Sequence, residues 1–418
     1  MKFGDDQFDP RGLVSNSLIL CFQAVRNNVR RALDTLIVGG SFAGVKTAWD
    51  LRNKLPRHHR ITLISDKPKT IIRASFPRVV FEDVPIDQLA FDLAKSFKGT
   101  GIEFVHDPLR RVDQAKNQIV TARGTYKFDF LVIATGARSA YELLPGSREY
   151  AKSICDPSRI AETKRALLDF REGEFYTGAG AGYTPCDGPP LEMLLGLDHR
   201  LRRLGCRDRA RLSFFTDKQN LLPPGGPTTW TYLEKLFKTR RLKALLGVEL
   251  TRLDEDYLYF EDGKKKPYDL CLVIPPYRGI KPLRHSGLTD ERGFIPVEPT
   301  TMRARQSENY NIYAVGDAAA IPGPKQGHLA LMQAGVAAAH IAWRINGKGE
   351  VPSYLPEFKC VMYLGGGTGL YLYSQWLSDG DVEVAKASRQ AELSKIKFEN
   401  LFFARRGNIG ELHRTMIK

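Results

Sequence analysis

Short apolar runs without charge recur along this chain, and each leads into a glycine-rich or acidic segment. Residues 36–38 (LIV) form one such run and continue into 39–44 (GGSFAG), after which apolar residues recur at helical spacing over 45–51. A second run over 61–64 ends at Ser65 and Asp66. Uncharged runs of this length are typical of strands buried on both faces of a parallel sheet. The pattern therefore predicts strand, glycine turn, helix and strand over 34–66.

The glycine turn has the features of a dinucleotide-binding site. Glycines let the backbone turn tightly and approach a pyrophosphate, which lies at the helix N-terminus. Asp66 follows Gly44 by 22 positions, close to the spacing of the acid that binds a ribose. Ser41 occupies the position where the middle glycine of this motif is usual, so the six-residue motif alone is weak evidence for a dinucleotide site. The cofactor contacts predicted here are Gly39, Gly40, Ser41, Phe42, Ala43, Gly44 and Asp66.

Two later strands end in similar segments. Residues 126–137 (YKFDFLVIATGA) end at Thr135 and Gly136, and residues 311–318 (NIYAVGDA) end at Gly316 and Asp317. A terminal Gly-Asp brings a carboxylate to the ribityl chain of a bound flavin. The three signals in this order predict FAD as the cofactor and indicate a flavoprotein with two dinucleotide-binding domains.

A second α/β unit lies between the last two signals. Residues 173–182 (GEFYTGAGAG) and 211–217 (RLSFFTD) repeat the strand, glycine turn and acid, which in a pyridine-nucleotide reductase would hold NAD(P)H. Here the turn continues as YTPCDGPP over 183–190. Proline removes a donor and constrains its neighbour, so the helix is delayed. We predict that the nicotinamide site is lost and that Cys186 lies in the gap.

Composition narrows the possible partners. The 418 residues are 43% hydrophobic and 26% charged, which predicts two or three ordinary globular domains, but the net charge is +15. The basic residues are scattered and no nucleic-acid motif is present, so an anionic membrane surface or a small anion is the expected partner. Six cysteines without a CxxC pair argue against a disulfide scaffold and against a metal site. No uninterrupted apolar stretch reaches the ~18 residues of a membrane span.

Seven segments together resemble the sulfide:quinone oxidoreductases, most closely the archaeal members, over residues 34–418. They appear in that family's order and include three cysteines in characteristic contexts. The segments are 153–157 (SICDP), 186–189 (CDGP) with Glu192, 272–277 (LVIPPY), 293–296 (GFIP), 313–317 (YAVGD), Pro324-Lys325 with Gly327, and 358–361 (FKCV).

The resemblance implies roles for individual residues. Cys186 and Cys360 match the redox cysteines, joined by a disulfide or a sulfur chain beside the flavin, and Cys155 matches a cysteine that in some members is bonded to FAD. Lys325 matches a lysine near the flavin pyrimidine and the quinone pocket. The remaining assignments are Leu109 at adenine, Arg73 at the cofactor, and His328, Phe398 and Phe402 at the quinone.

The implied activity is oxidation of hydrosulfide to sulfur or polysulfide, with electrons passed through FAD to membrane quinone. A disulfide is the electrophile that hydrosulfide attacks, and Lys359 could lower the thiol pKa of Cys360 if both side chains face the same way. Two alternatives stay open. One is a type II NADH:quinone oxidoreductase, and the other is the flavoprotein subunit of a sulfide dehydrogenase that acts with a cytochrome.

The C-terminal part of the sequence indicates how the protein would contact a membrane. An alanine-rich helix is expected over 319–342, and 391–418 places Leu393, Ile396, Leu401 and Phe402 among cations such as Lys395. This pattern favours a helix lying in the headgroup plane, although packing on its own domain or on another subunit is the alternative. We expect a peripheral, monotopic membrane protein and a homo-oligomer.

The predicted fold is α/β, with two Rossmann-like domains arranged as in glutathione reductase and a C-terminal membrane-associating extension. Residues 1–33 are an extension, either loosely held or a surface helix. The predicted divisions are 34–140 (FAD domain, first part), 141–288 (second Rossmann-like domain), 289–345 (FAD domain, second part) and 346–418 (C-terminal domain).

Overall fold

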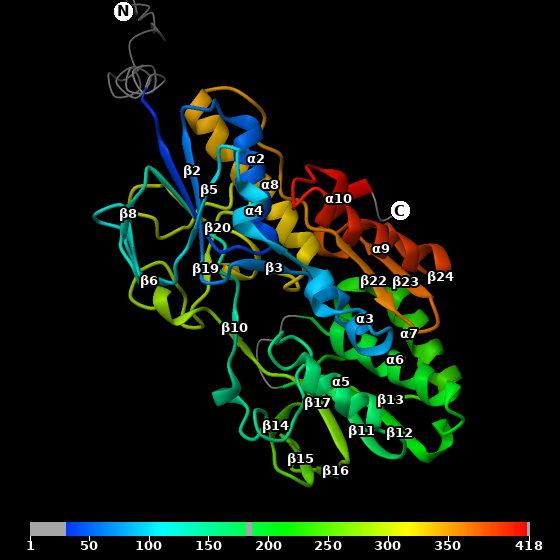
Figure 1. Cartoon of the computed structure of the whole chain (residues 1–418). Coiled ribbons are helices and arrows are strands. Elements are labelled where there is room, and N and C mark those ends of the chain that lie inside the picture. The colour runs from blue at the N-terminus through cyan, green and yellow to red at the C-terminus, as the bar shows by residue number, and fades with distance from the viewer. Residues whose placement is uncertain (1–30, 181–185, 416–418) are drawn as a thin grey trace, which may run out of the picture.

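The computed structural model describes residues 31–180 and 186–415 of the chain (Figure 1). The expectations for residues 1–30, and the part of the second glycine turn over 181–185, lie outside the described residues. Two α/β units lie one above the other in Figure 1, and the C-terminal segment packs along one side of both.

The upper unit is built on a five-stranded parallel sheet in the order β20-β9-β1-β2-β5. The last strand of this sheet along the chain, β20, pairs with β9 at Ala314 and Ile133, although the whole lower unit separates them in sequence. The carboxyl ends of β1, β9 and β20 therefore meet at one edge, where ligands of such sheets bind. The strands are β1 (Asp34–Val38), β2 (Arg60–Ser65), β5 (Glu103–His106), β9 (Phe130–Ile133) and β20 (Ile312–Ala314).

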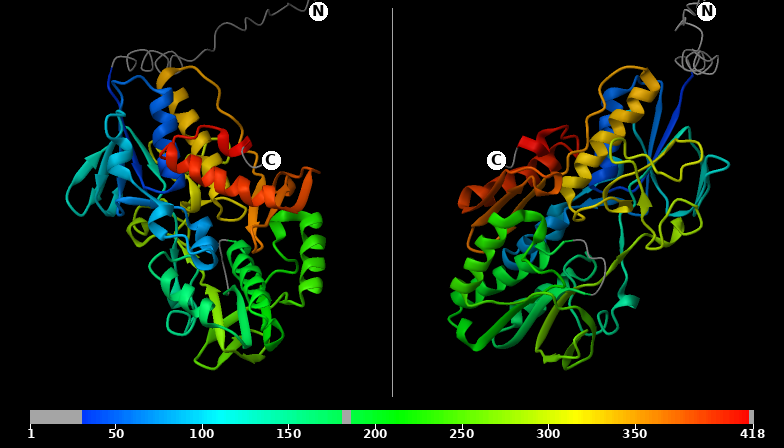
Figure 2. Two further views of the ribbon diagram at one scale, coloured as in Figure 1. Left: turned by 45° about the vertical axis from the view of Figure 1, so that its right-hand side comes forward. Right: turned by 180° about the vertical axis from the view of Figure 1, so that it is seen from behind.

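Helices α2 (Phe42–Lys54) and α8 (Gly327–Asn346) pack against each other beside this sheet (Figures 1 and 2). Buried alanines of α8, such as Ala334 and Ala338, permit the close approach. The helix expected from residue 319 begins only at Gly327. Pro322 and Pro324 precede it, and proline disfavours helical backbone in the residue before it.

A fully buried lysine joins α2 to the C-terminal segment. Lys46 Nζ lies 2.6 Å from Asp50 Oδ2 and 3.0 Å from the carbonyl oxygen of Gly410. Burial raises the pKa of Asp50, while Lys46 opposes that shift. The lysine is therefore the main charge that opposes the effect of burial on Asp50.

Replacing Lys46 by alanine should destabilise the protein strongly, because Asp50 would be left buried without its cation. Removing one partner of a buried pair costs about 3–5 kcal/mol. Urea denaturation followed by circular dichroism measures the loss, with Lys54→Ala, an exposed lysine of the same helix, as the matched control. Equal midpoints for the two variants would contradict the role of the pair.

The lower unit repeats the design of the upper one. Its four-stranded parallel sheet, in the order β13-β12-β11-β17, is covered by helices. Each unit also has a three-stranded antiparallel meander beside its parallel sheet. The elements of the lower unit are α5 (Ile160–Asp169), β11 (Gly173–Ala179), α6 (Gly188–Arg203), β12 (Ala210–Phe215), α7 (Gly226–Arg240), β13 (Lys243–Leu245) and β17 (Leu270–Ile274). The meanders are β6 (Leu109–Asp113), β7 (Gln118–Thr121) and β8 (Thr125–Lys127), and β14 (Leu250–Leu253), β15 (Tyr257–Phe260) and β16 (Lys265–Pro267).

The two units are joined by a short antiparallel pair, β10 (Arg138–Ser139) with β18 (Tyr277–Arg278). Other short elements complete the upper unit around the sheet: β3 (Lys69–Ile71), β4 (Ala90–Asp92), α4 (Leu93–Phe97), β19 (Ile295–Pro296) and β21 (Ala319–Ala320). Helix α3 (Phe76–Phe81) leaves the upper unit and packs against α5 and α6 of the lower one.

The C-terminal segment is an antiparallel sheet followed by two helices: β22 (Phe358–Tyr363), β23 (Gly369–Ser374), β24 (Glu383–Ser388), α9 (Arg389–Ala404) and α10 (Leu412–Thr415). Strand β22 packs against α6 of the lower unit and against α8 of the upper one. It thereby brings Cys360, a residue of β22, to the place where the two units meet; Figure 2 shows the C-terminal segment from two sides.

Helix α9 buries two of the residues that were expected at a membrane surface, Lys395 and Phe402. Glu392, Lys395, Glu399 and Phe402 are buried against the rest of the protein, whereas Leu393 is 52% exposed. The expectation that Lys395 and Phe402 lie at a membrane surface is therefore wrong, and packing on its own domain is what these residues do. Within the described ranges, no helix is both long enough and apolar enough to cross a bilayer.

Candidate functional site

The first glycine turn is as short as a dinucleotide site requires. Strand β1 ends at Val38 and α2 begins at Phe42. Gly39 has φ +119°, and a Cβ there would lie 2.1 Å from the carbonyl oxygen of Ala134. At Gly44 a Cβ would lie 1.8 Å from the oxygen of Gly39, so the turn and the helix can approach this closely only with glycine at both positions.

The N-terminus of α2 is open to a phosphate. Ser41 caps the helix but its side chain makes no capping hydrogen bond, and the first turn contains no acidic residue. Free N–H groups at such an end bind anions. Asp66, just after β2, has a side chain that is 62% exposed, so its carboxylate is available to a ribose. These features fit the ADP half of a dinucleotide.

The ends of β9 and β20 lie beside the same turn. Gly316 has φ +67°, a Cβ there would lie 3.1 Å from Ala43 Cβ, and its N–H donates to Gln333 Oε1 on α8 at 2.7 Å. Thr135, which follows β9, has a buried hydroxyl without a hydrogen-bond partner among the described residues. An orphaned buried hydroxyl at this edge fits a bound ligand.

Charged groups gather beyond β20. Burial raises the pKa of Asp317, while Lys325 and Arg73 act in the opposite direction. Burial lowers the pKa of Lys325 to about 8; its ammonium donates to the carbonyl oxygen of Ala319 and lies over the ring of Phe294. Asp317 and Lys325 also line a small cavity. The predicted contacts from three distant parts of the chain are thus brought together, while Leu109, predicted at adenine, is the first residue of β6 and is buried.

The three predicted site cysteines, Cys155, Cys186 and Cys360, pack against one hydrophobic cluster, as does Cys206. Gly188 N–H donates to Cys186 Sγ at 3.3 Å. Burial raises the pKa of Cys155 to about 11 and of Cys186 to about 12, and raises that of Cys360 as well. Cys155 adds to the shift of Cys186, and Cys186 to that of Cys360, so neighbouring thiols lie within electrostatic range of one another.

The cation that faces Cys360 is Lys395, not Lys359. Side chains alternate along β22, and Lys359 Nζ donates to the carbonyl oxygen of Arg414 at 2.7 Å and lies 3.6 Å from Glu357. Lys395 Nζ instead lies 2.8 Å from Glu192 Oε1 and opposes the upward pKa shift of Cys360. The expectation for Lys359 is therefore wrong. The spacing of Glu392, Lys395, Glu399 and Phe402 on one helix face could have indicated the buried lysine.

A second polar cluster lies at the start of α8. His328 Nε2 is 3.0 Å from Glu357 Oε1, and the hydroxyl of Tyr373 donates to Glu357 Oε2 at 2.9 Å. The hydrogen bond from His328 is the main cause that lowers the pKa of Glu357 to about 2. Burial lowers the pKa of His328, so the imidazole is neutral near pH 7.

The two predicted quinone aromatics belong to a ring cluster next to this site. Phe402 is fully buried, with its ring centroid 4.9 Å from that of Phe42 and 6.1 Å from that of Phe398. Phe398 is half-buried. Phe42 follows the glycine turn and lies against Gly327 of α8, so the cluster adjoins the site of Lys325 and His328.

The second glycine turn differs from the first in length and charge. Eight residues, 180–187, separate β11 from α6, and Pro189 and Pro190 stand in the first turn of the helix, which confirms the predicted delay. The N-cap residue is Asp187, which is buried; Thr216 Oγ1 donates to its Oδ2 at 3.4 Å. An acidic residue at this helix end, where the first unit has none, disfavours the pyrophosphate that the first unit would attract.

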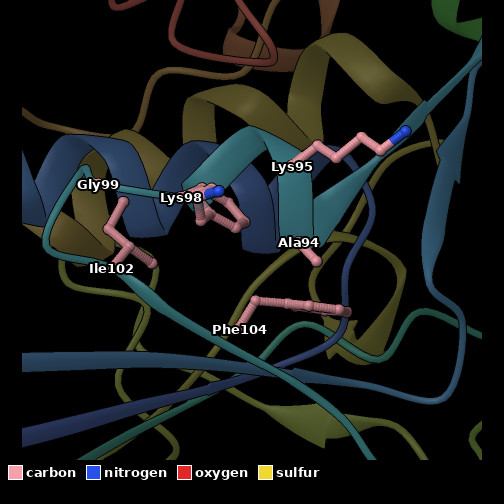
Figure 3. A pocket seen from close by; sticks show the side chains of 7 residues that line it. Ala94, Lys95, Lys98, Gly99, Ile102 and Phe104 are labelled. Atoms are coloured by element: carbon pink, nitrogen blue, oxygen red, sulfur yellow. The ribbon is translucent and has the colours of Figure 1, made fainter.

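A separate shallow hollow lies between α4 and β5, on the upper unit (Figure 3). Ile102 and Phe104 line one side, and the side chains of Lys95 and Lys98 extend from its rim. It contains none of the predicted site residues, and we assign it no function.

Comparison with known proteins agrees with this arrangement. The chain is 26% identical to the sulfide-quinone reductase of Aquifex aeolicus over 90% of this chain and 92% of that protein. It is 23% identical to a type II NADH:quinone oxidoreductase of Staphylococcus epidermidis over 75% and 83%. The X-ray structure of the Aquifex aeolicus sulfide:quinone oxidoreductase superposes with a TM-score of 0.84 at 24% identity, covering 90% of this chain and 92% of that one. Residues 33–339 match the model of one family, and the chain belongs to it: the pyridine nucleotide-disulphide oxidoreductases.

Proposed function

We propose that this protein is a sulfide:quinone oxidoreductase that oxidises hydrosulfide to sulfur or polysulfide. The observation behind the proposal is that Cys186 and Cys360, far apart in sequence, pack against one cluster with Cys155 and lie within electrostatic range of neighbouring thiols, while Cys155 also interacts with Asp317 of the cofactor edge. The similarity to sulfide-quinone reductases over nearly the whole chain supports the same activity.

Family membership implies FAD as the cofactor. Gly39 to Gly44 would hold its phosphates, Asp66 a ribose, and Thr135, Asp317 and Lys325 its flavin half. When bound, FAD accepts an electron pair on the sulfur side and gives it to quinone. The chain's own residues place the sulfur atoms and control charge around them.

The sulfur chemistry requires Cys186 and Cys360 to be joined as a disulfide in the oxidised enzyme. Hydrosulfide attacks Cys186 Sγ, the bond between the two cysteines breaks, and a new sulfur–sulfur bond forms at Cys186. Cys360 leaves with the bonding electrons as a thiolate. Lys395, the cation that opposes the pKa rise of Cys360, stabilises that thiolate.

Quinone reduction takes up protons on the opposite side of β22. We propose that Lys325, whose pKa is about 8, supplies one of them and that the hydrogen-bonded His328–Glu357–Tyr373 cluster relays protons to the site. Phe398 is the ring proposed to pack on the quinone, with Phe402 behind it. Access of a membrane quinone implies a peripheral protein on an anionic membrane surface, which the net charge of +15 favours.

Anaerobic titration of the purified protein tests the proposal. Sulfide should bleach the flavin absorbance, and NADH should leave it unchanged, because Asp187 and the displaced helix α6 oppose nucleotide binding. The second candidate, an NADH:quinone oxidoreductase, is favoured by the match to the staphylococcal enzyme. Bleaching by NADH but not by sulfide would establish that candidate instead.

A covalent bond between Cys155 and FAD is part of the proposal. Arg73 and Asp317 both influence the pKa of Cys155, so this thiol shares its surroundings with the cofactor groups. We expect acid precipitation to leave the flavin in the protein pellet, and Cys155→Ser to release it to the supernatant. Cys206→Ser, a half-buried cysteine, is the control. Release from the parent protein would show that the flavin is held without a bond.

A further inference from the structure

A buried carboxylate near the sulfur site has no partner. Glu392, in the first turn of α9, is 2% exposed, and neither of its carboxylate oxygens has a hydrogen-bond partner among the described residues. Buried carboxylates are normally paired or hydrogen-bonded. A buried carboxylate without a hydrogen-bond partner inside an enzyme indicates a group that gains and loses a proton.

One rung of the β22–β23 ladder links Glu392 to the cysteines. Tyr363 on β22 pairs with Gly369 on β23. Tyr363 N–H donates to Glu192 Oε1 at 2.8 Å, and a Cβ at Gly369 would lie 3.0 Å from Glu392 Oε2. The two carboxylates therefore flank the same rung, and Glu192 is the partner of Lys395, which faces Cys360.

The cluster continues to the surface. Glu392, Lys395 and Glu399 share one face of α9 at helical spacing. Arg78 Nη1 on α3 lies 2.6 Å from Glu399 Oε2, and Arg78 Nε lies 3.2 Å from Glu82 Oε2, whose side chain is 29% exposed. The two cations of this cluster, Lys395 and Arg78, thus pair with three of its four carboxylates, those of Glu192, Glu399 and Glu82. The fourth carboxylate, Glu392, pairs with neither cation.

The charged groups around Glu392, together with its burial, explain why its pKa is raised. Burial is the largest cause that raises its pKa to about 7, Lys395 opposes the shift, and Glu82, Glu192 and Glu399 add to it. These groups come from α3, α6 and α9. A carboxyl that changes charge near neutral pH is suited to accept and release protons.

Oxidation of hydrosulfide must release a proton. After attack at Cys186 the substrate sulfur still holds its hydrogen as a persulfide. A new sulfur–sulfur bond to Cys360, for which FAD would be the two-electron oxidant, cannot form until that proton leaves. We propose that Glu392 receives this proton from the site of Cys360 by way of Glu192, while Lys395 keeps its charge, and releases it to solvent on the side of Glu82. The inference rests on the proposed function, because it assigns the proton of that same reaction.

The test compares Glu392→Gln with the parent in anaerobic stopped-flow reduction of the flavin by sulfide. The hydrosulfide concentration, rather than total sulfide, is held constant at each pH, since hydrogen sulfide itself titrates near neutral pH. We expect a loss of about 100-fold in rate and disappearance of the parent's rise in rate through pH 7. Glu234→Gln, an exposed glutamate on α7, is the matched control and should keep the parent's rate and profile.

A second measurement is independent of turnover. Because the folded-state pKa is raised, the parent loses stability as pH rises from about 4.5 to 7, whereas glutamine cannot ionise. The melting temperature of Glu392→Gln should rise relative to the parent by at least ~2 °C between pH 5 and pH 8. If the difference in melting temperature between Glu392→Gln and the parent stays constant with pH, or if the variant keeps the parent's rate profile, this inference is wrong and the proposed function still stands. A parent flavin that sulfide leaves oxidised overturns the proposed function and this inference with it.

Discussion

Replacing Cys360 by serine will leave the flavin oxidised when sulfide is added without oxygen. The serine fills the same position on β22, but its oxygen cannot form or leave a sulfur–sulfur bond. Removing a residue that forms the covalent intermediate should lower the rate of flavin reduction by at least ~10³-fold. The same loss is expected for Cys186→Ser, and the double variant should be no worse than either single one, because the two residues act as a unit.

Stopped-flow absorbance of the flavin measures this effect, and reduction by dithionite shows that the flavin in each variant remains reducible. Cys271→Ser is the matched control, because Cys271 is buried in β17 within a different hydrophobic cluster from the other three cysteines. A Cys360→Ser protein that sulfide still reduces at the parent's rate would remove Cys360 from the reaction.

Much of the cofactor edge could be predicted because backbone geometry dictates it. Gly39 and Gly44 are required by contacts closer than any side chain permits, and such requirements are visible in sequence. The delay of α6 was likewise predictable, because proline acts on its immediate neighbours. The fold of the two α/β units follows from apolar runs whose length and order leave few topologies.

Charge placement at the sulfur site could not be predicted in the same way. Lys359 is next to Cys360 in sequence, yet alternation along β22 sends it to the other face. Lys395 and Glu392 are polar residues in a helix whose pattern suggested a surface location, and only packing against β22, β23 and α3 shows them to be buried. Tertiary contacts decide which charges of an amphipathic helix lie inside.

The charge pair Lys395–Glu192 leads to the second prediction, that Lys395→Met raises the thiol pKa of Cys360 further and slows flavin reduction about 100-fold. Although burial disfavours the ammonium, Glu192 holds the pKa of Lys395 above its ordinary value, so the lysine is charged throughout the working range. It is the one residue among the main causes that favours the Cys360 thiolate. Loss of that cation should shift the pH profile of Cys360 alkylation by iodoacetamide, in the reduced enzyme, upward by about one unit or more.

A structural explanation would predict a different outcome for the double variant Glu192→Gln, Lys395→Met. The single variant leaves Glu192 buried and unpaired, which alone costs about 3–5 kcal/mol of stability and could slow the enzyme by disordering the site. The double variant removes that uncompensated charge and should recover the melting temperature. If Lys395 acts on the thiolate, the alkylation profile shifts upward in the single variant and returns to or below the parent's position in the double variant, because Glu192 raises the thiol pKa of Cys360 more than Lys395 lowers it. An alkylation profile that keeps the parent's position in the single variant, while the melting temperature falls, would reduce Lys395 to a partner of Glu192 and leave the Cys360 thiolate without a cation in the mechanism.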